Sequence, residues 1–188
     1  MRLSIAGQAA LLLLHRDTDY YPLLTSIVIY PRPFRTDVRR DIGGGVVLES
    51  QEQRLGESWR HGTLVLAWDA VSQGARDPSD GLNVVLHEFA HQLDAQSGRT
   101  DGAPPLPRRA AYAPWARVLG AEFEHLKGEL ATHHASFLRA YGATNPAEFF
   151  AVVTEVFFER PAALRAYNPE LYTQLSGFYQ QDPAAWTG

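Results

Sequence analysis

The sequence predicts an α+β fold in which a small twisted sheet lies beside a helical core. Runs rich in β-branched residues occur between residues 26 and 68, whereas helical patterns dominate from residue 82 onward. One strongly apolar pattern among these, residues 82–93, contains two histidines four positions apart. A chain of 188 residues can bury a substantial core as one unit, so we expect residues 1–188 to form a single domain.

The N-terminal run, residues 1–14, is expected to be a buried helix. Gln8 interrupts its apolar character, no small-residue cleavage site follows it, and it is too short to cross a bilayer. Strands are expected at residues 26–30, 45–52 and 63–68, with a flexible turn at the glycines 43–45. A proline-rich connecting loop is expected at 98–107, and helices are expected at 82–93, 114–132, 148–158 and 171–179.

Composition limits the function classes. The formal net charge is −4, so neither nucleic acid nor a membrane surface is an expected partner. The arginines at 32, 35, 39 and 40 are expected to lie on a solvated surface loop. The absence of cysteine excludes disulfides, cysteine catalysis and cysteine metal sites, and it is compatible with the cytoplasmic location that we expect.

The segment His87-Glu88-Phe89-Ala90-His91 is an HExxH motif. On a helix, side chains four positions apart share one face, so His87 and His91 can bind one zinc ion from the same side. Glu88 lies one step around the helix, where a carboxylate can act as a general base toward water without being a ligand. The alternative is a helix whose histidines fill a core, but buried imidazoles need a polar partner and a metal ion supplies one. The pattern is typical of zinc peptidases.

A zinc site of this kind requires a third protein ligand. Asn145 as N-cap and Pro146 at the first helical position predict the start of a second helix. This helix carries Glu148 in its first turn and Glu155 two turns later on about the same face. Glu148 can equally be the glutamate of a capping box, and Glu155 an ordinary ion-pair partner, so the spacing leaves the third ligand open between them. No third histidine follows in the metzincin pattern.

Several segments together carry a family resemblance. They read HEFAHQLD at 87–94, GRTDG at 98–102, YGATNPAEFFAV at 141–152, EVFF at 155–158 and FYQQDP at 178–183. Through these segments the sequence resembles the Mlc titration factor A family of bacterial zinc peptidases, related to the catalytic domain of anthrax lethal factor. The resemblance runs from about Met1 to Pro183, which is nearly the whole chain. The resemblance implies a zincin-like metallopeptidase domain of the gluzincin type.

The resemblance also implies roles for individual residues. It assigns one zinc ion per chain to His87, His91 and Glu148, makes Glu88 the general base and gives Tyr141 the stabilisation of the transition state. One position departs from related enzymes, in which an acidic residue four places after the ligand glutamate orients a zinc histidine, because this chain has Val152 there. The candidates that remain for this orienting role are Asp94 and Glu155, and a helix-end or loop contact is the alternative for Asp94.

Two function classes remain open. The first is a peptidase, expected to be an aminopeptidase by resemblance, whose partner is a peptide or protein substrate. The second is a regulatory binding protein, since family members bind the glucose-responsive transcriptional repressor Mlc and thereby influence sugar uptake. Relatives carry additional N-terminal sequence, so this chain is expected to be a short member or a shortened form.

The strand at 63–68 precedes the HExxH helix. In enzymes of this type such a strand is often a sheet edge, to which an extended peptide can add through backbone hydrogen bonds. Ala67 and Trp68 would then line the substrate cleft. The alternative is an ordinary interior strand.

Overall fold

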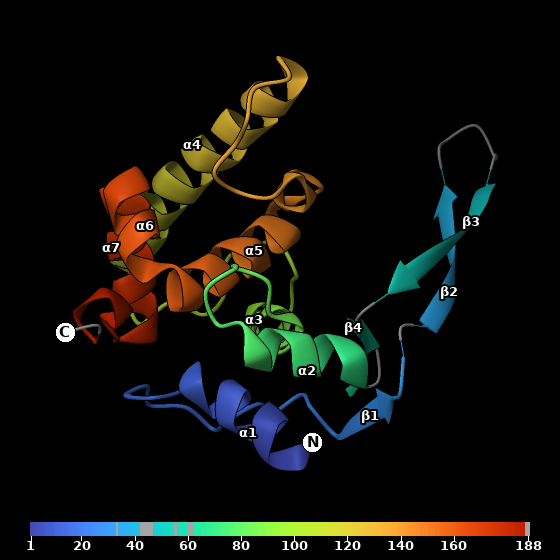
Figure 1. The fold of residues 1–188 in the computed structure, drawn as a ribbon. Coiled ribbons are helices and arrows are strands. Elements are labelled where there is room, and N and C mark those ends of the chain that lie inside the picture. Colours follow the sequence, from blue (N-terminus) through green and yellow to red (C-terminus); the bar gives the residue numbers. More distant parts are fainter. Residues whose placement is uncertain (33, 42–46, 55, 60–61, 187–188) are drawn as a thin grey trace.

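The computed structural model describes residues 1–186 apart from 33, 42–46, 55 and 60–61, and only the backbone of the strands between residues 34 and 59. A helical body lies beside a small sheet, and the β2–β3 ribbon extends away from that body (Figure 1). The predicted combination of helices and a small sheet is therefore confirmed. The elements in chain order are α1 (Arg2–Leu11), β1 (Ser26–Tyr30), β2 (Phe34–Asp41), β3 (Val47–Arg54), β4 (Gly56–Trp59), β5 (Thr63–Ala67), α2 (Trp68–Arg76), α3 (Val84–Ala95), η1 (Arg109–Ala111), α4 (Tyr112–Ala131), η2 (Ala140–Ala143), α5 (Pro146–Glu159), α6 (Pro161–Tyr167), α7 (Pro169–Tyr179) and η3 (Pro183–Ala185).

The sheet beside the helical body has the strand order β1-β5-β4. β5 is its middle strand, parallel to β1 and antiparallel to β4. The expectation that residues 63–68 form a sheet edge open to a peptide is therefore wrong, because both sides of β5 are already hydrogen-bonded. Ala67 is fully buried, so its side chain offers no surface to a substrate. Trp68 does not belong to the strand but begins α2.

The centre of the helical body is formed by α3 and α5. Every residue of α5 from 149 to 157 is buried, and so are residues 85–90 and 92–94 of α3. Each fully buried Leu or Phe contributes roughly 1.5–3 kcal/mol relative to an exposed side chain. Because neither helix has a wide polar face, both are held from all sides, which fixes one against the other.

The N-terminal helix is less buried than expected. Ile5, Ala9 and Leu12 face the core, but Leu3 is 89% exposed. The apolar run therefore forms an ordinary one-sided helix. Tyr21 holds α1 by donating a hydrogen bond from its hydroxyl to the Ala9 carbonyl at 2.6 Å.

Other expectations fail for identifiable reasons. Arg35, Arg39 and Arg40 lie in β2, which pairs with β3 in an antiparallel ribbon, so the loop predicted for them was wrong. Arg32 lies in an exposed bend before β2, as predicted. The glycine turn at 43–45 lies outside the described residues. The short helices α2 and α6 were not expected, because α2 contains Gly74 and α6 spans only seven residues. In the part of the chain that the structure describes, no helix has the length and apolar character needed to cross a membrane.

The loop at 98–107 is pinned at Gly102. The Gly102 N–H donates to Asp94 Oδ2 at 2.8 Å, and the Gly102 carbonyl accepts from Trp115 Nε1 at 2.9 Å. Gly102 has φ +77°, and a Cβ there would lie 2.4 Å from the Pro146 carbonyl oxygen. Gly102 therefore joins the end of α3 to the start of α5.

Gly102→Ala should destabilise the protein much more than Gly98→Ala. Both glycines have nearly the same positive φ, but a Cβ at Gly98 meets nothing within 4 Å. Gly98→Ala should therefore cost only the left-handed conformation, about 1–2 kcal/mol. Gly102→Ala should cost about 1–3 kcal/mol more, because the Pro146 backbone must move. Urea unfolding of the two variants measures the difference, and equal losses would contradict this account.

Candidate metal centre

The HExxH segment lies on α3, whose start is well capped. Asn83 Oδ1 accepts from the N–H groups of Val85 and Leu86, both at 3.1 Å, which satisfies donors that a helix start leaves unpaired. His87 and His91 then lie one turn apart on the same face. Their Nε2 atoms are 3.3 Å apart.

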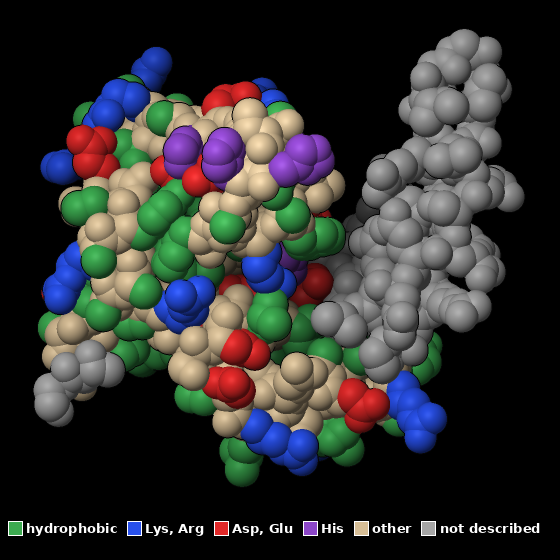
Figure 2. Space-filling view, turned by 45° about the horizontal axis from the view of Figure 1, so that its top comes forward, with side chains coloured by type: hydrophobic (Ala, Val, Ile, Leu, Met, Phe, Trp, Pro, Cys, Tyr) green, Lys and Arg blue, Asp and Glu red, His purple; other side chains and the backbone are tan. Residues whose placement is uncertain are grey.

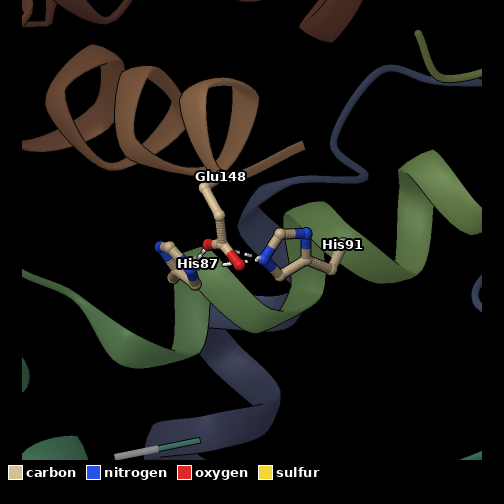
Figure 3. A group of neighbouring side chains, drawn as sticks. All are labelled: His87, His91 and Glu148. Atoms are coloured by element: carbon tan, nitrogen blue, oxygen red, sulfur yellow. Dashed lines mark hydrogen bonds and ion pairs between the residues drawn. The ribbon is translucent and has the colours of Figure 1, made fainter. Parts of the chain in front are cut away.

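A carboxylate from α5 completes the cluster. Asn145 Oδ1 accepts from the Glu148 N–H at 3.0 Å and Pro146 occupies the first turn, so the predicted cap is confirmed. The side chain of Glu148 points toward the two imidazoles of α3 (Figure 3). Its Oε2 lies 3.0 Å from His87 Nε2 and 3.3 Å from His91 Nε2.

The three donor atoms fit a tetrahedral cation. Ligands about 2.0–2.1 Å from a tetrahedral zinc ion lie roughly 3.3 Å from one another, and the three separations in this cluster are 3.0, 3.3 and 3.3 Å. Within the described ranges, His87, His91 and Glu148 are the one group of at least three potential ligand side chains whose donor atoms converge in this way. Two imidazole nitrogens and one carboxylate oxygen suit zinc and leave a fourth position open.

The electrostatics of the cluster favour positive charge. Burial alone would lower the pKa of His87, but hydrogen bonds with Glu148 and Glu155 outweigh it and raise that pKa to about 10. Burial would raise the pKa of Glu148, but its contacts with His87 and His91 bring that pKa well below the ordinary value. Because the raised pKa of His87 favours its protonated form, metal binding at this cluster competes with protonation.

Glu155 contacts the opposite side of the His87 ring. Its carboxylate is 2% exposed, and its Oε1 lies 2.7 Å from His87 Nδ1. The sequence left Glu148 and Glu155 as alternatives for the third ligand, and in the structure they contact different nitrogens of the His87 ring. Glu148 faces Nε2 together with His91, whereas Glu155 faces Nδ1 and lies behind the ring.

Glu88 and Tyr141 lie on different elements around this cluster. Glu88 is a buried residue of α3, next to His87 in the chain, with 6% exposure. Tyr141 belongs to η2, and half of its side-chain surface is exposed. The rings of Tyr141 and His87 have centroids 5.8 Å apart. Both residues therefore lie beside His87.

Asp94 is not hydrogen-bonded to a candidate ligand. It accepts from the Gly102 N–H, and His91 Nδ1 is buried without a hydrogen-bond partner in the described part of the chain. Burial raises the pKa of Asp94 to about 6. Its contact is thus the loop contact that was the alternative to an orienting role.

Two residues at the site were missed by sequence reasoning. Arg139 donates from its guanidinium to Glu155, and the Asn83 backbone N–H donates to the same carboxylate at 2.6 Å. Asn83 could have been found, because it directly precedes an apolar helical run as N-caps do. Arg139 belongs to no motif, and only the fold brings it to Glu155.

Two imidazoles and a carboxylate presented by two helices at this spacing are the arrangement expected of a metallopeptidase. Comparison with known proteins agrees on the metallopeptidase class. The chain belongs to the glucose-regulated metallo-peptidase M90 family, whose sequence profile matches residues 1–180.

Individual relatives extend the comparison. The chain is 41% identical to the protein slr2042 of Synechocystis sp. over 184 residues, which is 97% of this chain and 67% of that protein. It is 37% identical to Mlc titration factor A of Serratia proteamaculans over 188 residues, 98% of this chain and 71% of the relative. It is 39% identical to Mlc titration factor A of Klebsiella pneumoniae over 160 residues, 84% of this chain but 59% of that relative.

Replacing the two glutamates should affect metal binding differently. Glu148→Gln removes a candidate ligand and should weaken zinc binding more than about 100-fold, whereas Glu155→Gln removes a partner of a ligand and should weaken it about 10–100-fold. Competition with a chromophoric chelator measures both affinities. Glu170→Gln, on an exposed ion pair with Arg117, is the control. Unchanged affinity in Glu148→Gln would remove Glu148 from the site.

Proposed function

We propose that the protein is a zinc-dependent peptidase of the zincin type, with His87, His91 and Glu148 as the zinc ligands. The observation that carries this proposal is the convergence of their Nε2, Nε2 and Oε2 atoms at 3.0–3.3 Å from two separate helices. Membership of a metallopeptidase family supports it. We include in the proposal that residues 1–188 act as one domain.

The proposal gives each group around the zinc ligands a role. When bound, zinc polarises the scissile carbonyl and lowers the pKa of water toward about 7. Glu88, next to His87 on α3, accepts the proton of the attacking water and passes it to the leaving amine. The Tyr141 hydroxyl donates a hydrogen bond to the oxyanion of the tetrahedral intermediate. Glu155 accepts from His87 Nδ1–H, so that the other ring nitrogen, Nε2, remains free to coordinate.

The substrate is proposed to be a peptide cleaved from its N-terminus. This aminopeptidase specificity rests on the family resemblance of the HExxH, YGATNPAEFF and FYQQDP segments. On the face drawn in Figure 2, acidic and basic side chains are scattered and neither sign dominates. A cytoplasmic location also belongs to the proposal.

A second candidate function is binding to a transcriptional repressor. Relatives at 37–39% identity bear the name Mlc titration factor A, and this name is the observation that favours it. The two functions can coexist, with a bound repressor controlling the peptidase. They separate experimentally, since a pure binder needs no general base, whereas hydrolysis of amino-acid anilides requires both Glu88 and zinc.

Glu88→Gln should retain zinc and lose peptidase activity. The amide keeps the size of the side chain but cannot accept the water proton, which should lower kcat for anilide hydrolysis by about 10²–10⁴. Zinc content from elemental analysis is the control, together with loss of wild-type activity on chelation and its return with zinc. A zinc-loaded wild type without activity on any anilide or peptide would favour the binding function.

Tyr141→Phe should lower turnover without loss of metal. Removing one hydrogen-bond donor to an oxyanion costs about 10²–10³ in kcat. The zinc affinity should remain within about twofold, because the ring contacts His87 without supplying a ligand in this proposal. Loss of zinc from this variant would instead make Tyr141 a structural residue.

A further inference from the structure

The carboxylate of Glu155 is a buried charge with three donors around it. It lies 2.7 Å from His87 Nδ1 and 2.6 Å from the Asn83 N–H, and the Arg139 guanidinium contacts the same Oε1 that faces the histidine. With 2% of its side chain exposed, this carboxylate has almost no access to water. A carboxylate in such surroundings remains ionised only when it is paired and hydrogen-bonded.

Of the three donors, Arg139 brings the full positive charge. The Asn83 N–H is neutral, and His87 must be a neutral imidazole when its Nε2 coordinates a metal. In the metal-bound protein the charge of Glu155 is therefore balanced from this side by the guanidinium. The guanidinium contacts Oε1 through Nη2, and its planar group holds that donor in a defined direction, unlike the rotating ammonium of lysine.

The backbone of Arg139 is itself held in place. Arg139 is the residue before η2, and its carbonyl accepts from the Gly142 N–H at 3.0 Å. Its side chain is 37% exposed, so it reaches from the surface inward to a carboxylate on α5. The backbone of Arg139 is thus held at the start of η2, while its guanidinium contacts Glu155 on α5.

We propose that Arg139 is a positioning residue for the metal centre. It holds Glu155 in the orientation in which Oε1 accepts from His87 Nδ1, and this bond turns His87 Nε2 toward Glu148 and His91. The inference rests on the proposed zinc site and adds to it a residue that makes no contact with the ion or the substrate.

The test compares Arg139→Met and Arg139→Lys with Arg117→Met. Arg117 forms an ion pair with Glu170 at 2.9 Å, but both side chains are about two-thirds exposed, so its loss should leave the centre unchanged. Zinc affinity is measured by chelator competition, and the absorption spectrum of the Co²⁺-substituted protein reports ligand geometry independently of activity. Arg139→Met should bind zinc about tenfold more weakly and alter the cobalt spectrum. Arg139→Lys should keep the charge but restore only part of the affinity.

A double variant distinguishes the loss of Glu155 positioning from the cost of leaving the Glu155 charge buried without its partner. Glu155→Gln removes the carboxylate, so adding Arg139→Met to it should weaken zinc binding by less than about twofold. If Arg139→Met only lowers Tm, with zinc affinity and cobalt spectrum as in the wild type, the inference is overturned. If it fails to fold, Arg139→Lys decides by the same two readouts. If the wild-type protein binds neither Zn²⁺ nor Co²⁺, the proposed function itself is overturned. If the wild type binds zinc and the Arg139 variants bind it equally well, only the inference about Arg139 is overturned.

Discussion

The packing of α3 against α5 is the constraint on which the centre depends. His87 and Glu148 are 61 positions apart in the chain, yet their facing atoms lie 3.0 Å apart. No local preference can bring them together, so the side chains buried between the two helices must do so. Because such interiors are close-packed, the core holds the three donor atoms at separations that suit a tetrahedral ion.

The two glutamates of α5 show how burial separates residues of one type. Glu148 and Glu155 are two turns apart on about the same helix face, and both contact His87. Glu148 lies in the first turn, where the helix dipole and partial exposure suit an anionic ligand. Glu155 lies where the helix is buried on all sides, so its charge requires Arg139 and Asn83. The two residues are of the same type, and their surroundings differ: Glu148 faces Nε2 of His87, and Glu155 faces Nδ1.

The sequence could predict relations between residues that are close together in the chain. The spacing of His87 and His91 and the cap at Asn145 depend on residues a few positions apart, and sequence patterns describe such relations well. The relation between Glu148 and Glu155 was left open because it depends on how α5 lies against α3. The position of β5 was predicted wrongly for the same reason, since a middle strand is recognised only when the pairing of β1 and β4 is known. Arg139 required the fold itself.

Two links between α3 and α5, one a hydrogen bond and one a close backbone contact, have a common consequence. At the start of α3, Asn83 meets Glu155 near the end of α5. Near the end of α3, Asp94 holds Gly102, which abuts Pro146 at the start of α5. The helices therefore run in opposite directions, and the candidate ligands lie between the two links on both of them. A slide of one helix along the other would break both links together. The spacing of the donor atoms is thus fixed at both ends of the helix pair by residues that are not candidate ligands.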